Sequence, residues 1–287
     1  MKNKYKRIAL IVIISCLGYP GYSQEVSDSN YTFNSGAELF RQYKFDEAIY
    51  WFDSSIKKGH NVAMSYTFKG GAEILLGKLE EGRTDLDMAF SLDSTISQAY
   101  FYRARQLMLM NDYNASIIFL KKAIKLAPAD YTLYDNMAKA FLARHQIDSA
   151  KQYANEAIRL THNGPMLISH LAIIEFEAGE YELALIHQQA ALDLSFKVTR
   201  KKDPALLIDI ASCEWKLKKY PSALSRCEEV LREYPDYSSA YNLRGLINYD
   251  LGKKDKACAD FMTASHIKGA ENAGLDNLKT HGCPVEN

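Results

Sequence analysis

The sequence predicts an all-α chain, a solenoid of about seven helix-turn-helix repeats closed by a C-terminal capping helix. The first observation is a 34-residue period. Consecutive windows begin at Ser29, Ala63, Ser97, Tyr131 and Pro165, and two later windows begin at Pro204 and Ser238. The second observation is that two positions of the window are small in all seven copies. Position 8 holds Gly36, Gly70, Ala104, Ala138, Ala172, Ala211 and Gly245, and position 20 holds Ala48, Gly82, Ser116, Ala150, Ala184, Ala223 and Ala257.

The stretch 97–128 shows why this pattern indicates a helical hairpin. Its first half places a large, a small and a large side chain on one helical face, at Tyr100, Ala104 and Leu107. Its second half has a similar face, and Asn111 and Asp112 between the halves favour a turn. One hairpin cannot bury its apolar face alone, so we expect successive hairpins to stack.

This spacing resembles the tetratricopeptide repeat (TPR), whose pattern is W-x2-L-G-x2-Y, then A-x3-F, A and P. In 97–128 the matching residues are Tyr100, Arg103, Ala104, Leu107, Tyr113, Ser116, Leu120, Ala123 and Pro128. The resemblance extends from 29 to about 271, with departures at Gln188 (position 24) and Lys254 (position 17). It implies a right-handed α-solenoid whose concave surface binds segments of partner proteins.

Repeat phase also predicts the organisation of the chain. We expect repeats one to five over 29–196, a longer connection at 197–203, repeats six and seven over 204–269, and a capping helix over 270–281. The frame slips by five residues at the connection, which falls in a local basic run, 196–202. This run is either an extended helix or solvated connection, or else a hinge or a contact with an acidic partner.

The first 23 residues lie outside the repeat pattern and resemble a bacterial signal peptide. Four basic residues precede an apolar run at 8–17, and Gly21 and Ser23 are small residues before a cut ahead of Gln24. The alternative is a lipoprotein signal that is cut before Cys16, with lipid attached to that cysteine. Both interpretations predict export, to the periplasm or the outer-membrane periphery of a bacterium.

Charge argues against nucleic acid as a partner. The chain has 35 basic and 35 acidic residues, and without the first 23 residues 31 basic and 35 acidic remain, a net charge near −4. Such a surface lacks the basic footprint that DNA or RNA requires. We therefore expect a protein or peptide partner, no cofactor, and no membrane contact except through lipid on Cys16.

Four cysteines follow Cys16, an even number in a chain expected to be exported. We expect a disulfide between Cys258 and Cys283, which would tie the capping helix to repeat seven. Cys213 and Cys227 occupy positions where small apolar residues would serve equally well, so a bridge between them is the less favoured alternative. No metal site is expected, because the cysteine and histidine spacing matches no standard zinc pattern.

Catalytic motifs are absent: the sequence contains no HExxH, GxSxG or CxxC. The prediction is therefore a protein that is not an enzyme but an exported scaffold that binds a protein or peptide. The alternative is a lipid-anchored outer-membrane TPR lipoprotein that is a structural component of an envelope assembly or secretion machine.

The TPR resemblance also predicts the binding residues, since first-helix positions 2, 5, 9, 12 and 13 line the concave surface in that family. On this frame the candidates are Phe33, Phe40, Phe101, Arg105, Met108, Lys139, Phe176, Trp215, Lys216 and Tyr249. Large apolar side chains on an inner face suggest a partner surface, unless neighbouring repeats cover them. No paired Lys and Asn clamp recurs at these positions, so the chaperone-tail-binding subgroup is not indicated.

Overall fold

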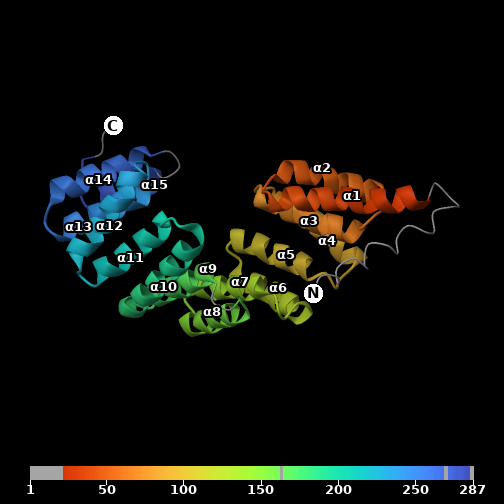
Figure 1. Ribbon diagram of the computed structural model, residues 1–287, viewed down its shortest axis with the longest axis horizontal. Helices are drawn as coiled ribbons and strands as arrows, with labels where there is room; N and C mark the ends of the chain where they lie inside the picture. Colours follow the sequence, from red (N-terminus) through yellow and green to blue (C-terminus); the bar gives the residue numbers. More distant parts are fainter. Residues whose placement is uncertain (1–21, 162–163, 268–270, 285–287) are drawn as a thin grey trace, which may run out of the picture. The chain divides into compact units, whose positions relative to one another are not determined.

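The computed structural model describes residues 22–161, 164–267 and 271–284, and in these ranges it contains fifteen α-helices and no strand (Figure 1). Consecutive helices pair as hairpins, so the predicted all-α fold of helix-turn-helix repeats is confirmed. The signal peptide and Cys16 lie outside the described residues, apart from Tyr22 and Ser23 at the beginning of the first helix.

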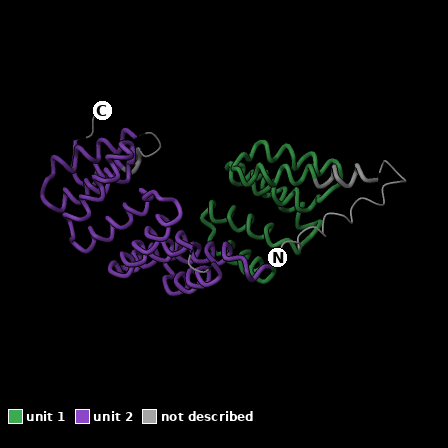
Figure 2. Tube along the Cα trace, in the orientation of Figure 1, with its two compact units in different colours: residues 1–126 green, residues 127–287 purple. Residues whose placement is uncertain are grey.

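The described residues form two compact units, divided between Leu126 and Ala127 (Figure 2). The first unit holds three hairpins. Its helices are α1 (Tyr22–Arg41), α2 (Phe45–Lys57), α3 (Val62–Leu75), α4 (Leu79–Leu92), α5 (Ser97–Leu109) and α6 (Tyr113–Leu126). Within it α2 packs on α3, and α4 packs on α5, so each hairpin covers the next.

The second unit holds four hairpins and one further helix. Its helices are α7 (Tyr131–Ala143), α8 (Ile147–Thr161), α9 (Pro165–Glu177), α10 (Tyr181–Thr199), α11 (Pro204–Lys216), α12 (Tyr220–Glu233), α13 (Ser238–Asp250), α14 (Lys254–His266) and α15 (Glu271–Thr280). Again the second helix of each hairpin packs on the first helix of the next, and α15 packs on α14.

The small residues of the frame lie where the two helices of each hairpin meet. Positions 8 and 20 are buried in all seven repeats. A Cβ added at Gly36 would lie 2.7 Å from the Phe52 ring, and one added at Gly245 would lie 2.5 Å from the Phe261 ring. The chain therefore uses glycine where the facing residue at position 24 is phenylalanine, because no room remains for a larger side chain.

Each hairpin turn has the same backbone geometry. The residue at position 15 has a positive φ in all seven repeats, between 55° and 81°, and is Tyr43, Gly77, Asn111, His145, Gly179, Lys218 or Gly252. The N–H of the next residue donates to the carbonyl at position 11 over 2.8 to 3.0 Å in every repeat. This is the Schellman arrangement, which satisfies carbonyl groups that the end of a helix would leave unpaired.

Proline and aspartate begin several of the first helices. Pro165 and Pro204 stand in the first turn of α9 and α11, where the N–H that proline lacks is not needed. The side chain of Asp130 accepts a hydrogen bond from the Thr132 N–H, and that of Asp203 accepts one from the Ala205 N–H. These caps satisfy free N–H groups at the N-termini of α7 and α11.

The longer connection expected at 197–203 is shorter than predicted. Helix α10 continues to Thr199, so 197–199 are helical and only 200–203 connect it to α11. The run has no glycine or proline to end the helix before Arg200, whose φ is 59°. The extra residues of repeat five therefore lengthen a helix, as one of the two sequence interpretations proposed.

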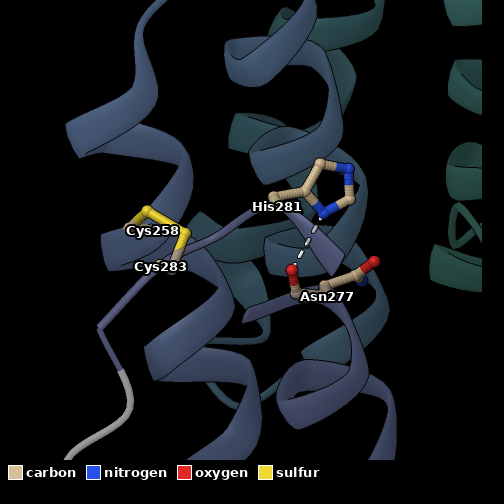
Figure 3. The surroundings of a disulfide bond; sticks show 4 residues. All are labelled: Cys258, Asn277, His281 and Cys283. Carbon is tan, nitrogen blue, oxygen red and sulfur yellow. Dashed lines mark hydrogen bonds between the residues drawn. A yellow bond between two sulfur atoms is a disulfide. The ribbon is translucent and has the colours of Figure 1, made fainter. Parts of the chain in front are cut away.

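Helix α15 covers the last hairpin. Leu278 is 1% exposed and packs with Phe261 and Leu275. Cys258 on α14 and Cys283 after α15 are joined by a disulfide, with 5.5 Å between their Cα atoms (Figure 3). Nearby, His281 Nδ1–H donates to the Asn277 carbonyl over 2.9 Å.

Candidate functional site

A cavity of the second unit lies along the first helices of its last three repeats. It measures about 550 Å³, and side chains of α9, α11 and α13 form its walls, with Gln188 of α10 beside them. Most of the wall is apolar, with Ile173, Phe176, Ile208, Trp215, Leu243 and Leu246. A volume of this size falls in the range of roughly 300–1,000 Å³ typical of ligand-binding clefts.

Trp215 is held in place at this cavity by two polar neighbours. Its indole Nε1–H donates to Asp250 Oδ2 over 2.7 Å, which joins the end of α11 to the end of α13. Lys216 Nζ lies 4.0 Å from the centroid of the Trp215 ring. Such a cation–π contact and a charge-assisted hydrogen bond both orient a half-buried indole.

Two neighbouring polar residues of the cavity wall, Gln188 and Asp209, are hydrogen-bonded to each other. Gln188 is 2% exposed, and its Nε2 donates long hydrogen bonds to Asp209 Oδ2 (3.4 Å) and the Ser169 carbonyl (3.5 Å). Its Oε1 has no hydrogen-bond partner among the described residues. Burial, and then the negative charge of Asp203, raise the pKa of Asp209 to about 6.

The first unit has a smaller cavity of about 430 Å³, lined by residues of α1, α2, α3 and α5 and of the α1–α2 turn. Phe40 contributes one wall, and its ring packs on Phe45 and Tyr102 at centroid distances of 5.3 and 5.9 Å. Phe101 contributes another, with the Arg105 guanidinium 5.9 Å from its ring centroid. This surface is aromatic and basic at its edge.

Six of the ten predicted binding residues line these two cavities. Phe40, Phe101 and Arg105 belong to the first unit's cavity, and Phe176, Trp215 and Lys216 belong to the second unit's. These six residues therefore lie on cavity walls, and their role in binding stays a prediction.

The other four predicted residues line neither cavity. Phe33 packs against the Phe52 and Phe68 rings, each at 5.9 Å, within the aromatic core of the first unit. Lys139 pairs with Asp135 at 2.7 Å, and the Tyr249 ring contacts the His281 ring at 4.4 Å. Met108 is half-buried on α5. Phe33 is therefore packed inside the first unit, whereas Tyr249 is 40% exposed and Lys139 pairs with a residue of its own helix.

Sequence reasoning missed Asp209 as a site residue, and it noted Gln188 only as a departure from the pattern. The signal was present, because position 24 holds a packing residue in the other repeats and a glutamine in repeat five. A buried amide at a packing position indicates a local polar requirement. Here that requirement is the polar wall of the cavity.

A second feature that the sequence analysis did not predict is a polar pair inside each of repeats five, six and seven. Position 11, where a large apolar residue was expected, is polar and contacts position 23 of the second helix. The pairs are Glu175 with His187 at 2.7 Å, Glu214 with Arg226 at 3.0 Å, and Asn248 with Asp260 at 3.2 Å. Each pair joins the two helices of its hairpin, so these side chains are structural.

The remaining cysteines are separate from the disulfide. Cys213 and Cys227 are free and buried, and burial raises the pKa of each thiol to about 12. The less favoured bridge between them is absent. A thiol with so high a pKa holds almost no thiolate at neutral pH, so neither residue is a reactive nucleophile.

The described ranges offer neither a membrane-spanning helix nor a metal site. None of the helices there combines the length and the apolar character needed to cross a bilayer. Likewise, no group of three His, Cys, Asp or Glu side chains in those ranges is placed to hold a metal ion.

Comparison with curated proteins gives distant relatives. The chain is 24% identical over 205 residues to "Anaphase-promoting complex subunit 3" of Schizosaccharomyces pombe, covering 70% of this chain and 30% of that protein. It is 25% identical over 104 residues to the "Hsp70-Hsp90 organizing protein" of Triticum aestivum, covering 36% and 18%. The chain thus spans less than a third of the length of either relative.

Solved structures share the fold over most of the chain. A tetratricopeptide repeat protein from Parabacteroides merdae superimposes with a TM-score of 0.69 at 16% identity, covering 90% of this chain and 99% of that one. The APC/C hetero-tetramer Cut9-Hcn1 gives a TM-score of 0.70 at 18% identity, covering 86% and 48%.

Family models match two parts of the sequence directly. Both are described as tetratricopeptide repeats, and they cover 97–130 and 208–265. The first coincides with repeat three of the predicted frame, and the second includes most of repeats six and seven. The chain therefore carries tetratricopeptide repeats and folds as TPR proteins do.

Proposed function

We propose that this chain is a non-catalytic scaffold that binds a protein or peptide partner through the cavities on the first helices of its repeats. The observation that carries the proposal is the 550 Å³ apolar cavity around Trp215 and Phe176. Apolar clefts with a few fixed polar groups are the usual binding sites of proteins. The wheat relative is named as an organiser of Hsp70 and Hsp90, which supports a partner-binding role for repeats of this kind.

The test is affinity capture after cross-linking in the native cell, quantified by mass spectrometry. We expect proteins captured by the wild type to be lost with Trp215→Ala or Phe101→Ala, because each change removes an aromatic wall of a cavity. Trp51→Ala is the matched control, since Trp51 packs on Tyr31 and Tyr50 and lines neither cavity. If the wild type and all three variants capture the same set of proteins, the cavities are not the binding sites.

We further propose that the chain is exported, in a soluble form that begins near Gln24. The basic residues at 2–7, the apolar run at 8–17 and the small residues Gly21 and Ser23 support this proposal. The expected location is the periplasm or the outer-membrane periphery of a bacterium.

The second candidate is an outer-membrane lipoprotein that is a structural component of an envelope assembly or secretion machine. Cys16 at the end of the apolar run favours it, because a lipoprotein signal is cut before a cysteine. Mass spectrometry of the mature N-terminus separates the two candidates. A free terminus near Gln24 supports the soluble form, a lipid-modified Cys16 supports the lipoprotein, and an uncleaved Met1 contradicts both.

A further inference from the structure

The cavity of the second unit contains a carboxylate that lacks a cationic partner. Asp209 lies partly buried on α11, and no Lys, Arg or His of the described residues forms an ion pair with it. Gln188 Nε2 donates a long hydrogen bond of 3.4 Å to its Oδ2. A carboxylate in an apolar wall is costly unless a donor or a cation joins it.

Gln188 provides a second, independent indication of a ligand. It lines the same cavity, is 2% exposed, and keeps an Oε1 without any donor. Buried side-chain oxygens in folded proteins are nearly always paired. Gln188 Oε1 lacks a donor, and the one that Gln188 supplies to Asp209 is 3.4 Å away, so both acceptors would be better satisfied by a group with several N–H bonds, such as an ammonium or a guanidinium.

The other charged residues of the cavity also favour a positively charged ligand. Glu177 on α9 is an exposed carboxylate at the edge, and Lys216 on α11 is already placed over the Trp215 ring. Asp203, just before α11, adds a further negative charge close enough to act on Asp209. The lining therefore carries one cation and two carboxylates, and its unpaired buried charge is negative.

We propose that this cavity binds a lysine or arginine side chain of an otherwise apolar peptide segment. Asp209 accepts the hydrogen bonds of the cation, and Phe176 and Trp215 pack against the apolar neighbours of that residue in the peptide. The inference rests on the proposed function, because it names the class of segment that the scaffold would bind.

The geometry suits such a segment for two reasons. A long aliphatic stem with a charged tip can lie along an apolar wall while its tip reaches a carboxylate. Attraction between the two charges is strong in this place, because the apolar surroundings lower the local dielectric and weaken screening by salt.

The experiment is a selection from a library of random, acetylated and amidated heptapeptides on beads, with labelled full-length protein. We expect the wild type to enrich peptides that carry Lys or Arg beside an aliphatic or aromatic residue. Asp209→Asn should lose the basic preference and keep the apolar one, because it changes the charge and little else. Glu182→Gln, which removes an exposed charge of α10 outside the cavity, is the matched control and should select as the wild type does.

One selected peptide then gives a double-mutant cycle by fluorescence anisotropy. Asp209→Asn should weaken binding about tenfold or more, the loss expected for a charge-assisted hydrogen bond. Replacing the basic residue of the peptide by norleucine should weaken wild-type binding to a similar degree and leave binding to Asp209→Asn unchanged. Binding should also weaken as the pH falls below about 6, where Asp209 becomes protonated.

The outcomes separate this inference from the proposed function. Selected peptides without a basic preference, or with acidic residues, overturn the inference, and so does a basic preference that Asp209→Asn retains. In these cases the proposed function stands if Trp215→Ala abolishes binding. If the wild type selects no peptide, or Trp215→Ala binds every selected peptide as well as the wild type does, the proposed function fails at this cavity and the inference fails with it.

Discussion

Residue size is matched between positions 8 and 24 in repeats one, three and seven. Phenylalanine at position 24 faces glycine in repeats one and seven, where a Cβ would overlap the ring. In repeat three the same two positions hold Ala104 and Leu120, both fully buried. The side chains at positions 8 and 24 therefore fill the same space between the two helices, and a methyl group added at one position requires a smaller side chain at the other.

This matching predicts a coupled substitution in repeat seven. Gly245→Ala should destabilise the fold by about 1–2 kcal/mol, because overpacking exceeds the advantage of alanine over glycine in a helix. The same change should cost much less beside Phe261→Leu, which recreates the Ala and Leu pair of repeat three. Urea unfolding of the four proteins gives the coupling, and an equal cost in both backgrounds would contradict the matching.

Glu73 is a buried acid whose charge the fold disfavours. It is 7% exposed on α3, and its Oε2 has no hydrogen-bond partner in the described residues. Burial, followed by its hydrogen bond to Asp85 and the charge of Asp85, raises its pKa to about 8, although the Lys69 ammonium acts in the opposite direction. Glu81 adds a smaller effect of the same sign as Asp85. Near neutral pH Glu73 is therefore mostly protonated in the folded chain.

The raised pKa of Glu73 predicts how stability changes with pH. The unfolded chain releases this proton near its ordinary value of 4.5, and the folded chain releases it near 8, so this group's contribution to stability falls between those values. Glu73→Gln should match the wild type near pH 4.5 and become more stable toward about pH 9. Glu47→Gln, an exposed acid on α2, is the control and should follow the wild type throughout. A Glu73→Gln difference that does not change with pH would refute the assignment.

At the scale of the element, the hairpin turn requires a left-handed backbone conformation at position 15, whatever residue stands there. Glycine or asparagine fills position 15 in four repeats, but Tyr43, His145 and Lys218 fill it in the others. The left-handed conformation costs a residue with a Cβ roughly 1–2 kcal/mol. Packing of the two helices and the Schellman hydrogen bond offset that cost.

His145 gives a test of this cost, because its side chain is exposed and its φ is 55°. His145→Gly should stabilise the chain by about 0.5–1 kcal/mol, since the relieved strain exceeds the entropy that glycine adds to the unfolded chain. Arg144→Gly, one residue earlier with a φ of −94°, is the matched control and should destabilise it. Thermal unfolding measures both, and a loss of stability at both positions would show that the turn carries no strain.

The disulfide links two elements, because it joins the segment after α15 to α14 with a sequence separation of 25 residues. Closing a loop of this length stabilises a fold by about 3 kcal/mol in the chain-entropy description. Cys283→Ser should therefore lower the thermal midpoint and speed hydrogen exchange in α15 more than in α9. Dithiothreitol should have the same effect on the wild type and none on the Cys258→Ser/Cys283→Ser double variant. Unchanged exchange in α15 would mean that packing of Leu278 alone holds the helix.

For the whole molecule, each compact unit carries its own cavity on the first helices of its repeats, one around Phe101 and one around Trp215. The two differ in chemistry, since the first has Arg41 and Arg105 in its lining and the second has the unpaired Asp209.

Sequence period was sufficient to determine the fold class, the helix pairs and six of the cavity residues. The contacts within one hairpin join residues of the same 34-residue repeat. The spacing of those residues can be seen in the sequence, so it predicts the hairpins. The same frame placed Cys258 on the second helix of repeat seven and Cys283 after the capping helix, and a disulfide joins the two.

Only the tertiary structure decided which inner-face side chains remain available and which polar groups lack partners. Phe33 matches the TPR frame as well as Trp215 does, yet it packs on the Phe52 and Phe68 rings and lines neither cavity. Asp209 and Gln188 follow no repeated pattern, and their isolation depends on the three helices that surround the cavity. The physical reason is that a helical period places a residue on a face, whereas partners, burial and the cost of an unpaired charge depend on which neighbouring helices contact that face.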